Sequence, residues 1–137
     1  EAARNAGVIT ADEFAVFQNA GYMGLYGGMT VDDIHRKKNL EVGQKILDYM
    51  GSTELIANLF RISQTEEKLR KDSVNSADTA TAVHYKVGSE VREAIEKIGG
   101  TMPEDLPTPE KSIAQLEKEQ LQRLKQQALD GQLMLDE

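Results

Sequence analysis

The sequence contains no cysteine and no tryptophan, and only 5% of its residues are aromatic. The absence of cysteine excludes disulfides and thiolate zinc sites, and it fits a reducing compartment. With so few aromatic residues, the core must be built mainly from Leu, Ile, Val, Ala and Met. No apolar run approaches the roughly 18 residues of a membrane span, and no secretory signal opens the chain. We therefore expect a cytoplasmic protein without a membrane contact.

Proline is also rare, with three residues in the chain. Long stretches carry neither proline nor the alternation typical of strands, which favours helices. The sequence thus predicts an all-α fold, an irregular bundle of several helices. The net charge of -7 argues against a general nucleic-acid coat, because phosphate binding needs a positive surface. Since the chain starts at Glu1, we also expect a preceding domain in a longer protein.

Glycine and tyrosine are concentrated in the segment AGYMGLYGGM, residues 20–29. It follows a predicted helix that Thr10 and Glu13 open with a capping box. Glycines at this spacing can form a phosphate cradle, but no strand precedes them and no Gly-Lys-Ser/Thr follows. We interpret the segment as a tight turn between helices, anchored by its tyrosines.

A basic cluster ends the next predicted helix, which Thr30 caps. Its members are His35, Arg36, Lys37 and Lys38. Together with the rings of Tyr22 and Tyr26, these cations could hold single-stranded nucleic acid, or they could bind a protein partner. The alternative is a solvated helix end whose cations complement the helix dipole.

The segment TELIANLFRISQTEEKLRK, residues 53–71, is the longest informative predicted helix, with Ser52 and Thr53 as its caps. One broad face carries six apolar residues: Leu55, Ile56, Leu59, Phe60, Ile62 and Leu69. This face predicts a central helix with Leu59 and Phe60 in the core. A second, narrow stripe is polar and consists of Glu54, Asn58, Arg61 and Thr65. The stripe indicates either a buried polar network or a partner-binding surface.

A heptad seam marks the next predicted helix, which Ser76 caps and Gly99 ends. The seam consists of Ala80, His84, Val87, Val91, Ala94 and Ile98. A proline-rich connector follows, and from Glu110 the chain is a polar, protruding helix that needs a partner. We expect a helical core domain over residues 1–108 and a tail over 109–137. A homodimer through the seam or the tail helix is one alternative for the partner.

No catalytic constellation is evident. The two histidines, His35 and His84, exclude a histidine-rich metal site, and we predict neither a metal nor a cofactor. A magnesium-dependent nuclease would have to draw on carboxylates such as Glu54, Glu66 and Glu67. However, neighbouring residues on a helix point in different directions, so an interaction module is the favoured interpretation and an enzyme is not.

Three segments resemble the C-terminal half of the bacterial DNA-damage-inducible protein D family: FAVFQNAGYMGLYGG, MGSTELIANLFRISQTEEKLRKD and GGTMPEDLPTP. The resemblance covers the chain to about Ser112. It implies a protein of the SOS response, in DNA damage, repair and recombination, whose N-terminal domain, similar to a phage antirepressor, is absent here. It further implies a role in opposing RecA-type recombinase filaments on single-stranded DNA. The alternative is a dimerisation module that presents the missing N-terminal DNA-binding domain.

Overall fold

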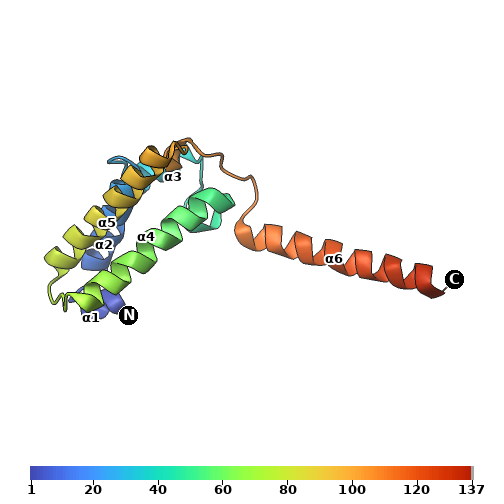
Figure 1. Cartoon of the computed structure of the whole chain (residues 1–137), viewed down its shortest axis with the longest axis horizontal. Helices are drawn as coiled ribbons and strands as arrows, with labels where there is room; N and C mark the ends of the chain where they lie inside the picture. The colour runs from blue at the N-terminus through green and yellow to red at the C-terminus, as the bar shows by residue number, and fades with distance from the viewer. Residues whose placement is uncertain (137) are drawn as a thin grey trace.

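The computed structural model describes residues 1–136, and side chains through Gly131. Within that range it contains helices and loops and no strand, so the all-α prediction is confirmed (Figure 1). The α-helices are α1 (Ala2–Asn5), α2 (Ala11–Leu25), α3 (Val31–Lys37), α4 (Ser52–Lys71), α5 (Ala77–Ile98) and α6 (Ile113–Asp136). Two short 3₁₀ turns span Ile46–Asp48 and Pro103–Asp105. No helix among the described residues is long and apolar enough to cross a membrane.

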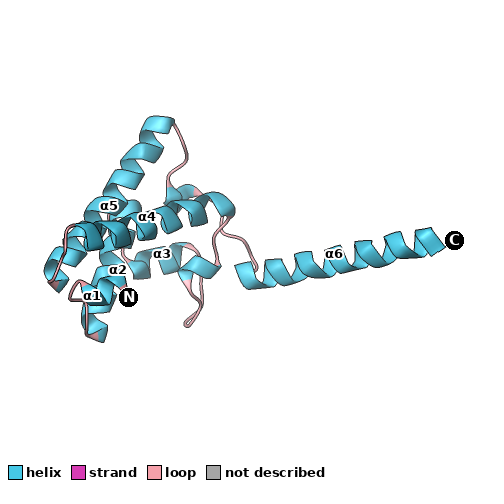
Figure 2. Cartoon of the chain, turned by 60° about the horizontal axis from the view of Figure 1, so that its bottom comes forward, coloured by secondary structure: helices cyan, strands magenta, loops and turns pink. Residues whose placement is uncertain are grey.

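Helices α2, α4 and α5 form the body, and α6 extends away from it (Figure 2). The most extensive contact between two helices is that of α2 with α5, and α4 packs beside α5. One apolar cluster centres on Leu25, Tyr26 and Met50, and a second centres on Phe17 and Leu69. The predicted capping box is present, because Thr10 Oγ1 accepts from the Glu13 amide and the Glu13 carboxylate accepts from the Thr10 amide.

The glycine-rich segment is not mainly a turn, which corrects the sequence prediction. Helix α2 continues through Gly21 and Gly24 to Leu25, and the chain turns only at Gly27 and Gly28, where φ is positive. An added Cβ on Gly24 would lie 2.2 Å from the Tyr85 carbonyl oxygen. The glycines therefore allow the α2 and α5 backbones to touch, a contact that local spacing does not reveal.

The apolar spacing of Val42, Ile46 and Met50 is typical of a helix, but residues 39–51 do not form one. Residues 39–51 make a loop with one 3₁₀ turn, in which Asn39 and Gly43 both adopt positive φ. These left-handed residues interrupt the helical hydrogen-bond ladder, and Val42 is left fully exposed. Ile46 and Met50 still reach the core, so the apolar pattern of this segment marked burial correctly while the conformation differed.

Helix α4 differs from the prediction over much of its apolar face, although Leu69 is buried and Leu55 packs against the core as expected. Its polar stripe faces the core, with Glu54, Asn58, Arg61 and Thr65 at most 2% exposed. The predicted core residues Leu59 and Phe60 are 50% and 54% exposed, and Ile56 is 66% exposed. The helix therefore exposes apolar side chains to solvent, and its polar stripe makes hydrogen bonds to the rest of the body.

The heptad seam of α5 is used mainly within the chain. Ala80, His84 and Val91 are buried, whereas Ala94 and Ile98, at its C-terminal end, are exposed. The buried residues of the seam are thus not accessible to a second copy, and a homodimer stays a prediction. The protruding helix is present and begins at Ile113, where the Ser112 hydroxyl accepts from the Gln115 amide at 3.2 Å. The boundary at residue 108 stays a prediction.

Candidate functional site

A buried hydrogen-bond network, called the relay below, consists of Tyr26, Lys38, Glu54, Asn58, Arg61 and His84. It links α2, α4 and α5, and Glu54 is its acidic end. The Glu54 carboxylate accepts hydrogen bonds from the Tyr26 hydroxyl and, at 2.8 Å, from Lys38 Nζ. Asn58 Nδ2 donates to the same hydroxyl at 3.0 Å. Burial, followed by the contact with Glu54, raises the pKa of Tyr26, so the hydroxyl remains a protonated donor. One buried carboxylate is thereby held by two donors from other elements.

Arg61 forms the basic end of the relay. Its guanidinium donates to Asn58 Oδ1 at 3.0 Å and to His84 Nε2 at 2.5 Å. It also lies 4.6 Å from the centre of the Tyr22 ring, within cation–π range. Burial lowers the pKa of Arg61, and no carboxylate pairs with it in the part of the chain that the structure describes. A buried cation held by neutral acceptors fixes α4 against α2 and α5 in one register.

His84 is neutral in this relay. Its Nδ1–H donates to the Phe17 carbonyl oxygen at 2.8 Å, which leaves the Nε2 lone pair to accept from Arg61. Burial, and then the charge of Arg61, lower the pKa of His84 to about 4. Burial and the neighbouring guanidinium outweigh the hydrogen bond to Phe17, which by itself raises the pKa, so protonation of His84 is unfavourable in the folded state.

The depressed pKa of His84 predicts a loss of stability in acid. Unfolded histidine titrates near pH 6.5, so between about pH 6.5 and pH 4 the unfolded chain binds a proton that the folded chain does not. The free energy of unfolding should fall by about 2 kcal/mol between pH 7 and pH 4.5 from this group alone. Urea unfolding at both pH values measures this loss, and His84→Gln should remove that part of the pH dependence. An unchanged slope in the variant would contradict the assignment.

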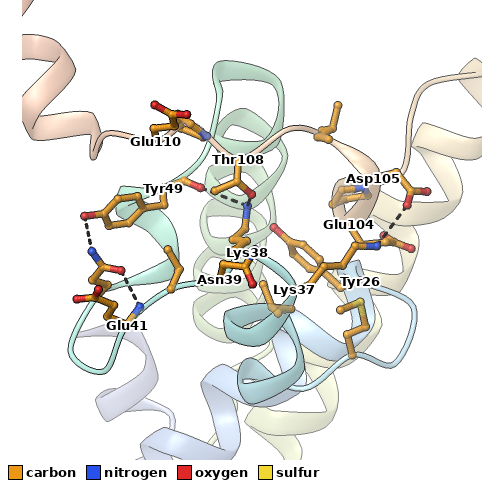
Figure 3. Close-up of a pocket in the computed structure, with 17 residues that line it drawn as sticks. Tyr26, Lys37, Lys38, Asn39, Glu41, Tyr49, Glu104, Asp105, Thr108 and Glu110 are labelled. Atoms are coloured by element: carbon orange, nitrogen blue, oxygen red, sulfur yellow. Dashed lines mark hydrogen bonds and ion pairs between the residues drawn. The ribbon is translucent and has the colours of Figure 1, made fainter.

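A hollow of about 720 Å³ lies beside Lys38, between the end of α3, the loop 39–49 and the proline-rich connector (Figure 3). The Lys38 side chain reaches from this hollow to Glu54. Its Nζ also donates to the Tyr49 carbonyl at 3.2 Å and to Thr108 Oγ1 at 3.3 Å. The three ammonium donors are therefore all used, and Lys38 ties the connector to α4.

The basic cluster does not form one nucleic-acid surface. His35 bonds to the Gln44 carbonyl, Arg36 pairs with Asp33 and Lys37 pairs with Asp105. Tyr22 and Tyr26 are buried, so neither ring can stack on a base, and the predicted stacking platform is wrong. Lys38 is buried as well, contrary to the expected solvated face. A phosphate contact by the exposed Arg36 and Lys37 stays a prediction.

The carboxylates of the nuclease alternative do not converge. Glu54 is buried near the start of α4, whereas Glu66 and Glu67 are exposed about 18 Å further along the helix. Among the described residues, no group of three or more His, Cys, Asp or Glu side chains is arranged to hold a metal ion. The geometry therefore gives this alternative no support.

The exposed apolar residues of α4 border two adjoining surfaces. Ile56 and Leu59 form the outer α4 face, which points away from the body. Phe60 instead lines a groove between α4 and α5, together with Val87, Val91 and Ala94, and the volume of this α4/α5 groove is about 470 Å³. Contiguous apolar surface of this kind is typical of protein-binding sites.

A comparison with protein families identifies the chain. The model of the DinD C-terminal domain matches residues 1–116. The chain belongs to this family. The resemblance inferred from three sequence segments is therefore confirmed, and the matched residues include the relay, the hollow and the α4/α5 groove.

The chain is similar to a curated relative, the DNA damage-inducible protein D of Escherichia coli (strain K12). The two are 62% identical over 117 residues, which is 85% of this chain and 43% of the relative. The chain thus spans less than half the length of that relative and covers its C-terminal part. No solved structure matches the chain. Most of α6 lies beyond the family match.

Sequence reasoning found the polar stripe of this DinD C-terminal domain but missed its partners. Lys38, Tyr26 and His84 come from elements remote in sequence, so no spacing rule connects them to Glu54 and Arg61. One signal was available: His84 replaces an apolar residue in the seam of α5, and a polar group at a buried position requires a partner.

Proposed function

We propose that the chain is a protein-binding module of the SOS response that opposes RecA-type recombinase filaments on single-stranded DNA in the bacterial cytoplasm. The name of the relative, a DNA damage-inducible protein, supports the link to DNA damage. On this proposal the module acts by binding rather than by catalysis, and it contacts recombinase protein rather than competing for DNA.

The observation that carries the proposal is the outer α4 face. Ile56 and Leu59 expose half or more of their surface although the same helix buries an acid, an amide and a guanidinium. Burying Glu54 and Arg61 is costly, and an apolar face turned inward would be the simpler way to build a core. The exposure of this apolar face is explained if the face contacts a partner that excludes water from it.

The charge distribution supports a protein partner. The chain carries a net charge of -7, and the basic cluster is divided among Gln44, Asp33, Asp105 and Glu54. A surface of this kind repels the phosphates of single-stranded DNA. An acidic module reaches a filament more readily through the recombinase than through the strand it coats.

Replacement of the outer α4 face tests the proposal. We expect Ile56→Ser with Leu59→Ser to weaken binding to recombinase filaments at least about tenfold, because each side chain would lose an apolar contact worth about 1 kcal/mol or more. Stability should change by about 1 kcal/mol or less per site, since both residues are already half in solvent. Pull-down of filaments assembled on single-stranded DNA, and inhibition of strand exchange, measure the effect.

Val42→Ser is the matched control, because Val42 is a fully exposed apolar residue in the loop 39–51, away from α4. It should bind filaments and inhibit strand exchange like the parent chain. If the parent chain does not bind filaments, the proposed function is wrong. If the double variant binds as well as the parent, the outer α4 face is not the contact.

A further inference from the structure

Helix α6 presents an apolar stripe that no described residue of its own chain covers. It stands apart from the body in both views (Figures 1 and 2). Leu116, Leu121 and Leu124 are 42–54% exposed and share one side of the helix with Ile113 and Ala128. An isolated, mostly polar helix gains little from propensity alone, so such a helix is stabilised by packing its apolar side against something.

The connector directs α6 away from its own body. Glu104 is held by two hydrogen bonds of 2.8 Å from Arg92, and Thr108 is held by Lys38. Pro107 and Pro109 stiffen the segment between these ties and α6. The exit direction is therefore set before the helix begins, and the helix points into solvent, where a second copy of the chain can receive it.

The α4/α5 groove has the size and character to accept one amphipathic helix. Its floor is apolar, with Phe60 from α4 and Val87, Val91 and Ala94 from α5. From Phe60 to Lys71 the lining of the groove runs for about 16 Å, and its apolar part on α5, from Val87 to Ala94, runs for about 10 Å. The α6 stripe from Leu116 to Ala128 runs for about 18 Å, so part of it can occupy the apolar part of the groove. Recognition of an amphipathic helix by an apolar groove is a recurrent mode of protein binding.

The charges along the groove and along α6 also correspond. The α4 rim carries Lys68 and Lys71 beside Glu67, a net positive charge, and the α5 rim carries Glu90. At 100° per residue, Glu119 and Asp130 flank one side of the α6 stripe beside Arg123, a net negative charge. Lys118 and Lys125 flank the other side, and Glu117 lies within the stripe. With its leucines in the groove, α6 can place its acids along the α4 rim and its lysines along the α5 rim.

We propose that α6 of a second copy docks in the α4/α5 groove, and that the exchange is reciprocal. Each copy then supplies one helix and one groove, which gives a closed two-fold dimer without a free apolar surface at either site. The outer α4 face adjoins the groove and stays available, so the dimer would present two such faces. This inference does not depend on the recombinase as partner.

The test is the oligomeric state of the 137-residue chain, measured by analytical ultracentrifugation over a wide concentration range without recombinase or DNA. We expect a dimer that dissociates on dilution. Leu121→Glu with Leu124→Glu blocks the helix, and Ala94→Glu blocks the groove at an exposed position. Each change should raise the dissociation constant on the order of 100-fold or more. Far-UV circular dichroism checks that the body remains folded.

Gln122→Glu adds one negative charge, like Ala94→Glu, but on the opposite side of α6 from the stripe, and it should leave the dimer unchanged. A chain that is monomeric at every concentration would overturn the inference, and so would a Gln122→Glu variant that dissociates like the leucine variant. A dimer that survives Ala94→Glu but not the leucine variant would mean that α6 pairs with α6. A dimer that survives the leucine variant would mean that α6 is not the contact. Because recombinase is absent, each of these results leaves the proposed function to its own test.

Discussion

Gly24→Ala should destabilise the chain by about 3 kcal/mol or more, the upper end of the cost of overpacking a core. The added Cβ would lie 2.2 Å from the Tyr85 carbonyl oxygen and 2.9 Å from the Ser89 amide nitrogen. Both obstacles are backbone atoms of α5, so no rotamer change relieves the clash and the helices must separate. The roughly 1 kcal/mol that alanine gains over glycine within a helix does not offset this loss. Urea unfolding followed by circular dichroism measures it.

Gly131→Ala is the control for this prediction. Gly131 also lies within a helix, but outside its own helix backbone no atom of the described residues stands within 4 Å of its added Cβ. The change should be neutral or should stabilise α6 slightly. Gly88→Ala provides a second test from the α5 side, since its Cβ would lie 2.7 Å from the Gly21 carbonyl oxygen. A Gly24→Ala variant as stable as the parent would show that α2 and α5 are not in backbone contact.

Lys38→Met should cost about 3–5 kcal/mol, the range for removing one partner of a buried ion pair. The side chains of Lys38 and Glu54 are 6% and 1% exposed, so the variant leaves a carboxylate buried with only the Tyr26 hydroxyl beside it. The variant also frees the connector from α4, because the bond to Thr108 is lost. Thermal and urea unfolding of the purified variant measure the cost.

Arg36→Met is the matched control, because Arg36 belongs to the same basic cluster but its side chain is 76% exposed. Its pair with Asp33 is solvated, and its loss should cost less than about 1 kcal/mol. Adding Glu54→Gln to Lys38→Met should recover part of the stability, since no uncompensated charge is then buried. The double-mutant cycle isolates the coupling between the two groups. Equal, small costs for Lys38→Met and Arg36→Met would refute the buried pair.

Much of the local structure follows from the sequence alone. The caps at Thr10, Thr30 and Ser76 and the stop at Gly99 act through backbone groups one turn away, so short-range spacing determines where these helices begin and end. The polar character of the tail likewise determines that α6 cannot belong to the core. Three segments of the sequence also indicate the family, because a family match depends on residue identities and their order rather than on packing.

Only the tertiary structure decided which face of each helix is inside. On α4 the apolar face predicted burial, but Lys38, Tyr26 and His84 supply partners that allow the polar stripe to be buried instead. On α2 the glycines predicted a turn, but a closely approaching α5 backbone makes them helix-packing residues. Both outcomes depend on groups far away in the chain. A helical pattern specifies that two faces differ, and the neighbours that fold against the helix determine which of the two is buried.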